Sequence, residues 1–137
     1  NKIKLKIIGD KKKFSKKLQI LLDKSEKETK NYQNLQINLA LNYGSREEIL
    51  NATRIIIRKK IKITEKTIEE NLYTKNIPNP DLLIRTGNTQ RLSNFLLWQI
   101  SYTEIFFEKK LWPNFKKKDY IKILKKFKTL KRNFGAI

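Results

Sequence analysis

The apolar residues of this chain follow two rhythms, and each rhythm predicts one kind of element. Four short, nearly continuous apolar runs predict strands, at residues 4–8, 35–41, 81–85 and 103–107. Apolar residues spaced three and four apart predict helices, at residues 15–30, 46–60, 64–72, 93–99 and 117–131. The second run becomes continuously apolar towards its end, which predicts a strand whose two faces are mostly covered.

The alternation of strands and helices predicts an α/β fold with a mostly parallel sheet flanked by helices. No repeat and no linker divides residues 1–137, so a single domain is expected. In such sheets ligands bind beyond the carboxyl ends of the strands. Three polar loops follow predicted strands at that edge, after Ile8, after Leu41 and after Ile84.

Composition narrows the chemistry that these loops can perform. The 137 residues contain no Cys, no His and no Met, which excludes disulfides, thiolate or imidazole catalysis and the usual zinc sites within the chain. Neither a bilayer-spanning run nor a signal-peptide pattern occurs. A cytoplasmic protein is expected, with room for peripheral contact at the inner face of the membrane.

The net charge of +19, from 32 basic and 13 acidic residues, would ordinarily suggest a nucleic-acid-binding protein. However, Lys outnumbers Arg by 26 to 6, and Ile and Asn are abundant while Val is absent. Lys, Asn and Ile are encoded by A/T-rich codons, so genomic bias accounts for much of the basicity. Nucleic-acid binding is therefore disfavoured, and an Arg that has not become Lys indicates a bidentate grip that Lys cannot reproduce.

Two of the six arginines, Arg85 and Arg91, lie in one short loop after a predicted strand. Gly87 allows that loop a tight backbone path, and Ser93 offers a hydroxyl at the start of a predicted helix, where free N–H groups also favour anions. Together these features predict a cradle for a diphosphate. The competing interpretation, given even weight, is that both arginines pair with acidic side chains and that Ser93 only caps the helix.

A single carboxylate, Glu104, lies within an otherwise apolar run. It either points outward as part of strand alternation, which is the commoner case, or helps to hold a hard cation such as Mg²⁺. Mg²⁺ sites in proteins typically combine one or two carboxylates with substrate phosphates, so a neighbouring diphosphate site would favour the second role.

Four segments closely resemble the carboxyl-terminal signature of cis-prenyltransferases, above all the bacterial undecaprenyl diphosphate synthases. They are residues 81–87 (DLLIRTG), 90–99 (QRLSNFLLWQ), 102–107 (YTEIFF) and 111–115 (LWPNF). Supporting matches are residues 7–10 (IIGD), 38–46 (NLALNYGSR) and 132–135 (RNFG). The resemblance implies a Mg²⁺-dependent transferase that condenses isopentenyl diphosphate with an allylic diphosphate, such as farnesyl diphosphate, in the cis configuration. Its product would be a polyprenyl diphosphate such as undecaprenyl diphosphate, a cell wall lipid carrier.

The resemblance also implies roles for particular residues. Arg85, Arg91 and Ser93 would bind the diphosphate of isopentenyl diphosphate, with Leu92 in the same contact segment. Glu104 would be a Mg²⁺ ligand. Gly135 matches a family segment that reaches towards the phosphate site across a homodimer interface, so a homodimer is expected.

The chain departs from the family pattern in two respects. Asn88 and Thr89 stand where the family usually has Gly or Ser and then Glu, so one loop carboxylate is absent; Ser45 and Ala136 are milder changes. The family's Asp-Gly-Asn-Gly-Arg loop, which carries its essential aspartate, does not occur in residues 1–137. We therefore expect these residues to be the carboxyl-terminal part of one domain, with about four of the family's six strands, and not to catalyse prenyl transfer alone.

Some interpretations stay open. A non-catalytic or remnant subunit of such an enzyme is the main alternative function, and a basic nucleic-acid-binding domain is a weaker one. Asn42, Tyr43 and Arg46 fit a structural turn better than a substrate contact. An apolar tunnel for the growing chain, or ordinary core packing, could each use Leu35, Ile37, Leu39 and residues 95–98.

Overall fold

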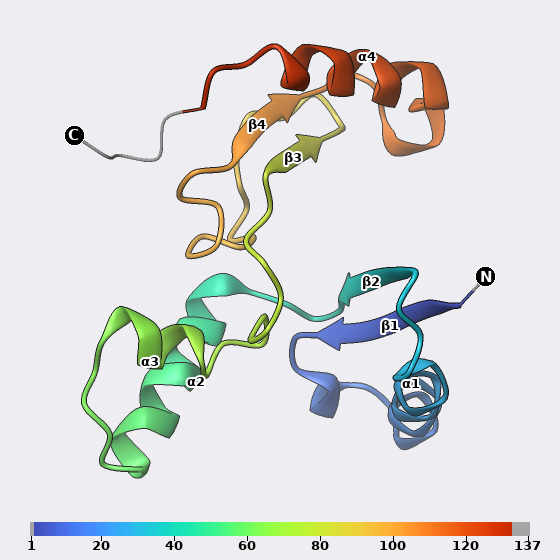
Figure 1. Ribbon diagram of the computed structural model, residues 1–137. Coiled ribbons are helices and arrows are strands. Elements are labelled where there is room, and N and C mark those ends of the chain that lie inside the picture. Colours follow the sequence, from blue (N-terminus) through green and yellow to red (C-terminus); the bar gives the residue numbers. More distant parts are fainter. Residues whose placement is uncertain (1, 133–137) are drawn as a thin grey trace. The chain divides into compact units, whose positions relative to one another are not determined.

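The computed structural model describes residues 2–132 and divides the chain into two compact units, Asn1–Ile77 and Pro78–Ile137. Figure 1 shows both units, and every strand pair in the described residues is parallel, as the sequence predicts. The expectation that residues 1–137 belong to a single domain stays a prediction.

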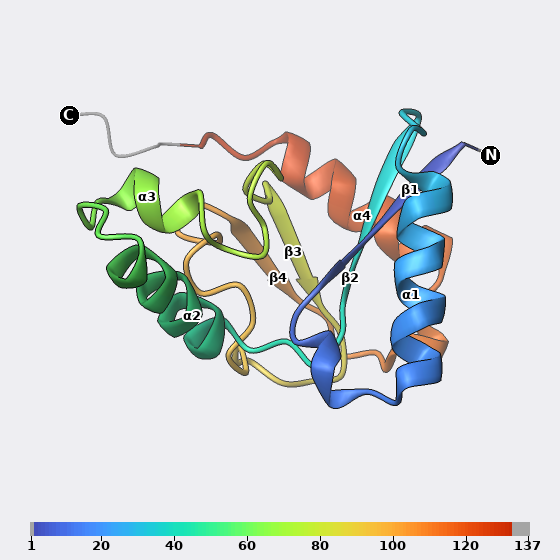
Figure 2. The same cartoon turned by 90° about the horizontal axis from the view of Figure 1, so that it is seen from below.

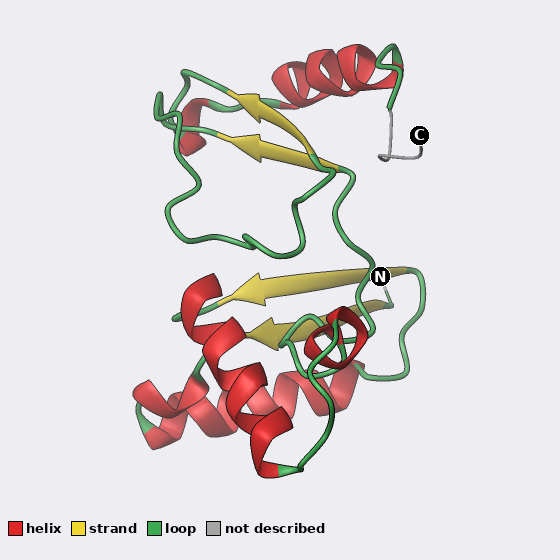
Figure 3. Ribbon diagram, turned by 90° about the vertical axis from the view of Figure 1, so that its left-hand side faces the viewer, coloured by secondary structure: helices red, strands yellow, loops and turns green. Residues whose placement is uncertain are grey.

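The first unit is a parallel strand pair with three helices. Its elements are β1 (Ile3–Ile8), a 3₁₀ turn η1 (Lys11–Lys13), α1 (Lys16–Thr29), β2 (Leu35–Ala40), α2 (Ser45–Arg58) and α3 (Glu65–Glu69). β1 and β2 pair from Ile3 opposite Leu35 to Ile8 opposite Ala40. Figures 1 and 2 show α3 lying beside α2, and Figure 3 shows the two strands pointing the same way. The element types are those that the apolar pattern predicts, although α3 ends at Glu69 and not near residue 72.

Polar side chains fix the ends of these elements. Ser15 precedes α1, and its hydroxyl accepts a hydrogen bond from the backbone N–H of Leu18 at 3.4 Å. Thr64 caps α3 in the same way through the N–H of Thr67 at 3.1 Å. Gly9 has a φ of +115°, and a Cβ at that position would clash with the carbonyl oxygen of Leu41. The turn after β1 therefore requires glycine.

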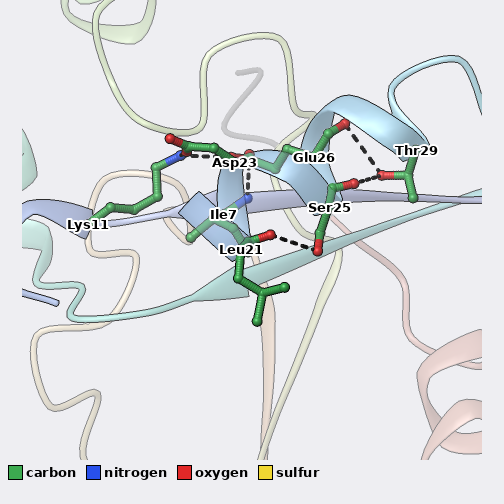
Figure 4. A network of polar contacts seen from close by, with 7 residues as sticks. All are labelled: Ile7, Lys11, Leu21, Asp23, Ser25, Glu26 and Thr29. Carbon is green, nitrogen blue, oxygen red and sulfur yellow. Dashed lines mark hydrogen bonds and ion pairs between the residues drawn. The ribbon is translucent and has the colours of Figure 1, made fainter. Parts of the chain in front are cut away.

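Side chains of α1 cover the edge of β1 that does not pair with β2. The backbone N–H of Leu5 donates to the Thr29 hydroxyl at 3.0 Å, and that of Ile7 donates to Glu26 Oε1 at 2.8 Å. Lys11 joins this network through Asp23 and Glu26 (Figure 4). Because the free N–H groups of an edge strand would otherwise pair with another chain, the network closes that edge of the sheet.

β2 differs from the expectation that both of its faces are covered. Leu35, Ile37 and Leu39 project to one face and are 54%, 40% and 40% exposed. The apolar run correctly predicts that β2 has an apolar face. A sequence pattern does not tell whether another element covers that face. Packing of the first unit centres on α2, where Ala52 and Ile56 are fully buried, and on Ile7 and Ile8 of β1.

The second unit is a smaller parallel pair with one long helix. It contains β3 (Leu82–Arg85), β4 (Glu104–Phe107), a 3₁₀ turn η2 (Trp112–Asn114) and α4 (Lys117–Lys128). β3 and β4 pair from Leu82 opposite Glu104 to Arg85 opposite Phe107. Lys126 of α4 lies 5.6 Å from the ring centroid of Phe106 on β4, so α4 covers one face of this pair. Ile123 is the buried residue of α4.

The helix predicted at residues 93–99 is wrong. Ser93, Asn94 and Leu96 all have positive φ angles, of 50°, 62° and 47°, and an α-helix needs negative φ throughout. The segment is a series of turns, closed by hydrogen bonds such as Phe95 N–H to Leu92 O at 3.0 Å. Local spacing favours a helix here, but the folded chain instead buries Gln99 and Ile100 in the unit. Ser93 is consequently not a helix cap.

Candidate functional site

The loop that follows β3 lies at the carboxyl end of that strand, where the sheet geometry predicts ligand binding. Arg85 is the last residue of β3, and its carbonyl accepts a hydrogen bond from the N–H of Glu108 at 2.7 Å. The next residues turn back sharply, since Gly87 and Asn88 have φ angles of +96° and +54°. The N–H groups of Gly87 and Asn88 donate to the carbonyls of Lys110 and Glu108. The tight path that Gly87 predicts is thus confirmed, and the loop is tied to the chain beyond β4.

The guanidinium of Arg85 is held by a neutral group. Its Nε–H donates to the hydroxyl oxygen of Thr89 at 2.9 Å, and both residues are half-buried. Thr89 stands where the resemblance led us to expect a carboxylate. No signal in the sequence indicated this contact, because a hydroxyl four positions away has no distinctive pattern.

Neither Arg85 nor Arg91 forms an ion pair with any residue between 2 and 132. Ser93 is exposed and caps no helix. Within the described residues, the competing interpretation of this loop, in which acidic partners neutralise both arginines and Ser93 serves as a cap, is therefore wrong. Two cations remain available in one loop.

A pocket of about 290 Å³ opens beside this loop. Its walls combine the last residues of β3 with the turns after it, namely Leu83, Ile84, Arg85, Thr86, Leu92 and Phe95. Arg91 and Ser93 flank Leu92, so three of the four predicted substrate-binding residues are consecutive and the fourth, Arg85, lines the same pocket as Leu92. A lining that combines four apolar residues with the cation Arg85 suits a small apolar group attached to an anion.

Glu104 and Arg85 lie at opposite ends of the β3–β4 strand pair. Glu104 begins β4 opposite Leu82, whereas Arg85 ends β3 opposite Phe107. Three residues at roughly 3.3 Å each separate them by about 10 Å along the strands. Side chains alternate along a strand, so Glu104 and Arg85 also project to opposite faces of the pair.

The described residues do not by themselves fit a Mg²⁺ site. Glu104 is half-buried, and residues 2–132 contain no group of three or more acidic residues placed to hold a metal ion. A single carboxylate gives too few of the oxygen ligands that Mg²⁺ requires. The assignment of Glu104 as a Mg²⁺ ligand stays a prediction, and Gly135 lies outside the described residues.

The other two loops at the carboxyl edge are occupied by structural contacts. After β1, the Asp10 carboxylate accepts from the N–H of Lys12 at 3.0 Å. After β2, Asn42 Nδ2 donates to the carbonyl of Asp10 at 3.0 Å, and the Tyr43 hydroxyl donates to Glu48 Oε2 at 2.5 Å. These contacts are the structural roles that the sequence favoured for Asn42 and Tyr43. Arg46 is exposed near the start of α2.

Comparison with known proteins gives consistent matches along the chain. Residues 1–135 match the family model described as "Putative undecaprenyl diphosphate synthase". An isoprenyl transferase of Thermotoga maritima is 39% identical over 99% of this chain and 60% of its own length. An isoprenyl transferase of Fusobacterium nucleatum is 43% identical over 100% of this chain and 60% of its own length.

A solved structure matches as well. The crystal structure of lavandulyl diphosphate synthase from Lavandula x intermedia, in complex with dimethylallyl diphosphate, superposes with a TM-score of 0.90 and 36% identity. The match covers 98% of this chain and 61% of that one. The chain thus spans about 60% of the length of the curated relatives it matches.

Proposed function

This chain belongs to the undecaprenyl diphosphate synthase family of cis-prenyltransferases, and on that premise we propose that it forms the isopentenyl diphosphate-binding part of a prenyl-chain-elongating transferase. The proposed reaction condenses isopentenyl diphosphate with an allylic diphosphate to give a polyprenyl diphosphate such as undecaprenyl diphosphate. The observation that carries the proposal is a pair of arginines that have no carboxylate partner among residues 2–132 and belong to one loop beside a pocket lined by Leu83, Ile84, Leu92 and Phe95 as well as Arg85.

In this proposal Arg85 and Arg91 bind the diphosphate of isopentenyl diphosphate, and the Ser93 hydroxyl donates to it. Leu92 and Phe95 contact the apolar isopentenyl group from the pocket wall. These residues hold the substrate in one orientation, so their contribution to the rate is proximity and charge neutralisation. The exposed stripe of Leu35, Ile37 and Leu39 offers an apolar surface for a prenyl chain.

The allylic substrate, the metal and the assembly are proposed on the resemblance. We propose farnesyl diphosphate or a similar allylic diphosphate as primer, and Mg²⁺ as cofactor with Glu104 as one ligand. The remaining ligands must be substrate phosphates or groups outside the described residues, since Glu104 alone makes no site. The isolated 137 residues are expected to bind isopentenyl diphosphate without elongating a primer.

We further propose a homodimer in the cytoplasm, with the basic surface available for contact with the inner face of the membrane. No helix among residues 2–132 is long and apolar enough to cross a membrane. The alternative of a remnant subunit is not favoured, because a decayed site would not be expected to keep both arginines and the pocket beside them.

Calorimetric titration of the chain with isopentenyl diphosphate tests the proposal. Arg85→Lys should weaken binding about tenfold, because an ammonium cannot reproduce a bidentate guanidinium contact. Arg54→Lys is the matched control, since Arg54 is an exposed arginine of α2 paired with Glu47 at 3.0 Å. Equal affinities for the two variants would contradict the proposal. A nucleic-acid-binding domain would instead bind oligonucleotides with a steep salt dependence and be indifferent to Arg85→Lys.

A further inference from the structure

Thr89 is the residue whose contact the proposed function does not explain. Its hydroxyl oxygen accepts the Nε–H of Arg85 at 2.9 Å, and no other hydrogen bond of the Thr89 side chain is found within residues 2–132. The residue follows the Gly87–Asn88 turn, whose N–H groups are bonded to the carbonyls of Lys110 and Glu108 at 2.8 Å and 3.2 Å. These bonds anchor the backbone directly before Thr89, whose hydroxyl contacts Arg85.

Thr89 contacts Nε of Arg85, and this choice of atom determines how the guanidinium is oriented. A guanidinium carries five N–H groups in one plane, and the Nε–H lies on the side of the stem. Fixing Nε orients the plane and leaves Nη1 and Nη2 without an acceptor among the described residues. With Nε held by Thr89, those two nitrogens form the remaining pair that can grip a phosphate in bidentate fashion.

The Thr89 hydroxyl is uncharged, which affects how strongly Arg85 can attract an anion. A carboxylate in the place of Thr89 would orient the guanidinium but would also pair with its charge. A hydroxyl orients the group and leaves the charge of Arg85 available to an anion. A flexible arginine loses side-chain entropy when it binds, and preorientation reduces that loss.

We propose that Thr89 is a positioning residue that holds the Arg85 guanidinium, through Nε, with both terminal nitrogens presented to the diphosphate of isopentenyl diphosphate. This inference rests on the proposed function, which assigns Arg85 to that diphosphate.

The test compares two substitutions that treat the hydroxyl differently. Thr89→Val keeps the size and β-branching but removes the acceptor, and it should weaken isopentenyl diphosphate binding about tenfold. Thr89→Ser keeps the hydroxyl and should bind within about twofold of the unmodified chain. Titration calorimetry at low salt measures both, since weak electrostatic complexes are strongest there. Thermal melting of each variant checks that the fold is retained.

Two further variants separate positioning from general stability. Thr53→Val removes a hydroxyl that bonds only to the Ile49 carbonyl within α2, at 2.9 Å, and should leave the affinity unchanged. Arg85→Lys has no Nε–H to be held, so adding Thr89→Val to it should cause little further loss.

The outcomes distinguish this inference from the proposed function. The positioning role is supported if Thr89→Val weakens isopentenyl diphosphate binding and Thr89→Ser does not. It also requires that Thr89→Val cause little further loss of affinity when Arg85→Lys is already present. If Thr89→Val binds normally while Arg85→Lys does not, the positioning role is wrong and the proposed function stands. Equal losses from Thr89→Val in both backgrounds would also overturn it, because Thr89 would then act independently of Arg85. If no variant changes binding, both inferences are wrong.

Discussion

Lys11 and Arg85 occupy comparable places in the two units, and their surroundings differ in an instructive way. Each lies at the carboxyl end of the first strand of a parallel pair, where a cation could meet an anionic ligand: Arg85 is the last residue of β3, and Lys11 lies shortly after β1. Lys11 bonds to Asp23 at 2.5 Å and Glu26 at 2.8 Å, and Glu26 also takes the N–H of Ile7 (Figure 4). Arg85 bonds to the hydroxyl of Thr89.

The difference shows that position at the carboxyl edge does not by itself make a binding site. Lys11 has a structural role, because its charge is already compensated by two carboxylates, one of which also accepts a backbone N–H. A cation held by a neutral hydroxyl keeps its charge for a ligand. In the loop that follows β3, Arg85 is such a cation, since its Nε–H donates to the Thr89 hydroxyl.

The largest expected effect comes from removing a buried carboxylate that has a structural role in the first unit. Glu48 is fully buried, and its carboxylate accepts from the Tyr43 hydroxyl and from the Tyr73 N–H at 2.8 Å. Glu48→Ala leaves both donors without this acceptor and creates a cavity, so the free energy of unfolding should fall by about 3 kcal/mol. Urea denaturation followed by circular dichroism measures the change.

The neighbouring residue gives the control for that experiment. Glu47 is exposed and pairs with Arg54 on the surface of α2, so Glu47→Ala should change the free energy of unfolding by less than about 0.5 kcal/mol. Equal effects for Glu47→Ala and Glu48→Ala would mean that burial of the Glu48 carboxylate does not stabilise the first unit.

Two serines, Ser15 and Ser93, allow the same comparison of a structural and a binding role, with smaller expected changes in the free energy of unfolding. Ser15 caps α1, and Ser15→Ala should lower the free energy of unfolding by about 1 kcal/mol. Ser93 is exposed at a φ of +50° and caps nothing, so Ser93→Ala should leave stability within about 0.5 kcal/mol. Under the proposed function it should instead weaken isopentenyl diphosphate binding about fivefold. A stability loss for Ser93→Ala like that for Ser15→Ala, without a change in binding, would make Ser93 structural.

These serines show one success and one failure of sequence reasoning, since the predicted helix cap forms at Ser15 and does not form at Ser93. Both precede an apolar segment with helical spacing, and the sequence gives no means of separating them. The cap forms at Ser15 because φ stays negative through α1; at Ser93 the left-handed residues that follow end any helix at once. Strand and helix types elsewhere were predictable, since hydrophobic periods of two and 3.6 report local geometry directly.

The candidate site was predictable only in part. Arg85 and Arg91 were identified because arginine is rare in this lysine-rich chain. Ser93 and Glu104 were candidates from their places in the sequence, and the family resemblance favoured a binding role for both and added Leu92. Thr89 and the network of α1 on β1 were not identified, because contacts of hydroxyls and backbone N–H groups between distant segments have no sequence spacing. The distance of Glu104 from Arg85 follows from strand register, which the chain alone does not fix.

The smallest expected effect concerns the pH dependence of the Lys11 network. The hydrogen bond from Lys11 holds the pKa of Asp23 below its ordinary value of 3.8, and the hydrogen bonds to Asp23 and Glu26 raise the pKa of Lys11 above 10.5. The depressed pKa of Asp23 contributes stability above pH 3.8 that is lost as the pH falls through the folded-state value. The raised pKa of Lys11 contributes stability below pH 10.5 that is lost as the pH rises through its folded-state value.

Lys11→Met keeps the aliphatic stem and removes the charge, so it should be less stable than the unmodified chain in the neutral range. The difference should shrink when the pH falls below about 3.8, where the Asp23 contribution disappears. Lys24→Met is the control, because Lys24 lies on α1 next to Asp23 and, among the described residues, its one ion pair is an exposed contact with Glu28 at 3.7 Å. Urea midpoints measured from acid to neutral pH should converge towards acid for Lys11→Met and not for Lys24→Met. Parallel curves for both variants would mean that Lys11 contributes only general charge, and the contrast with Arg85 would then rest on the arginine loop alone.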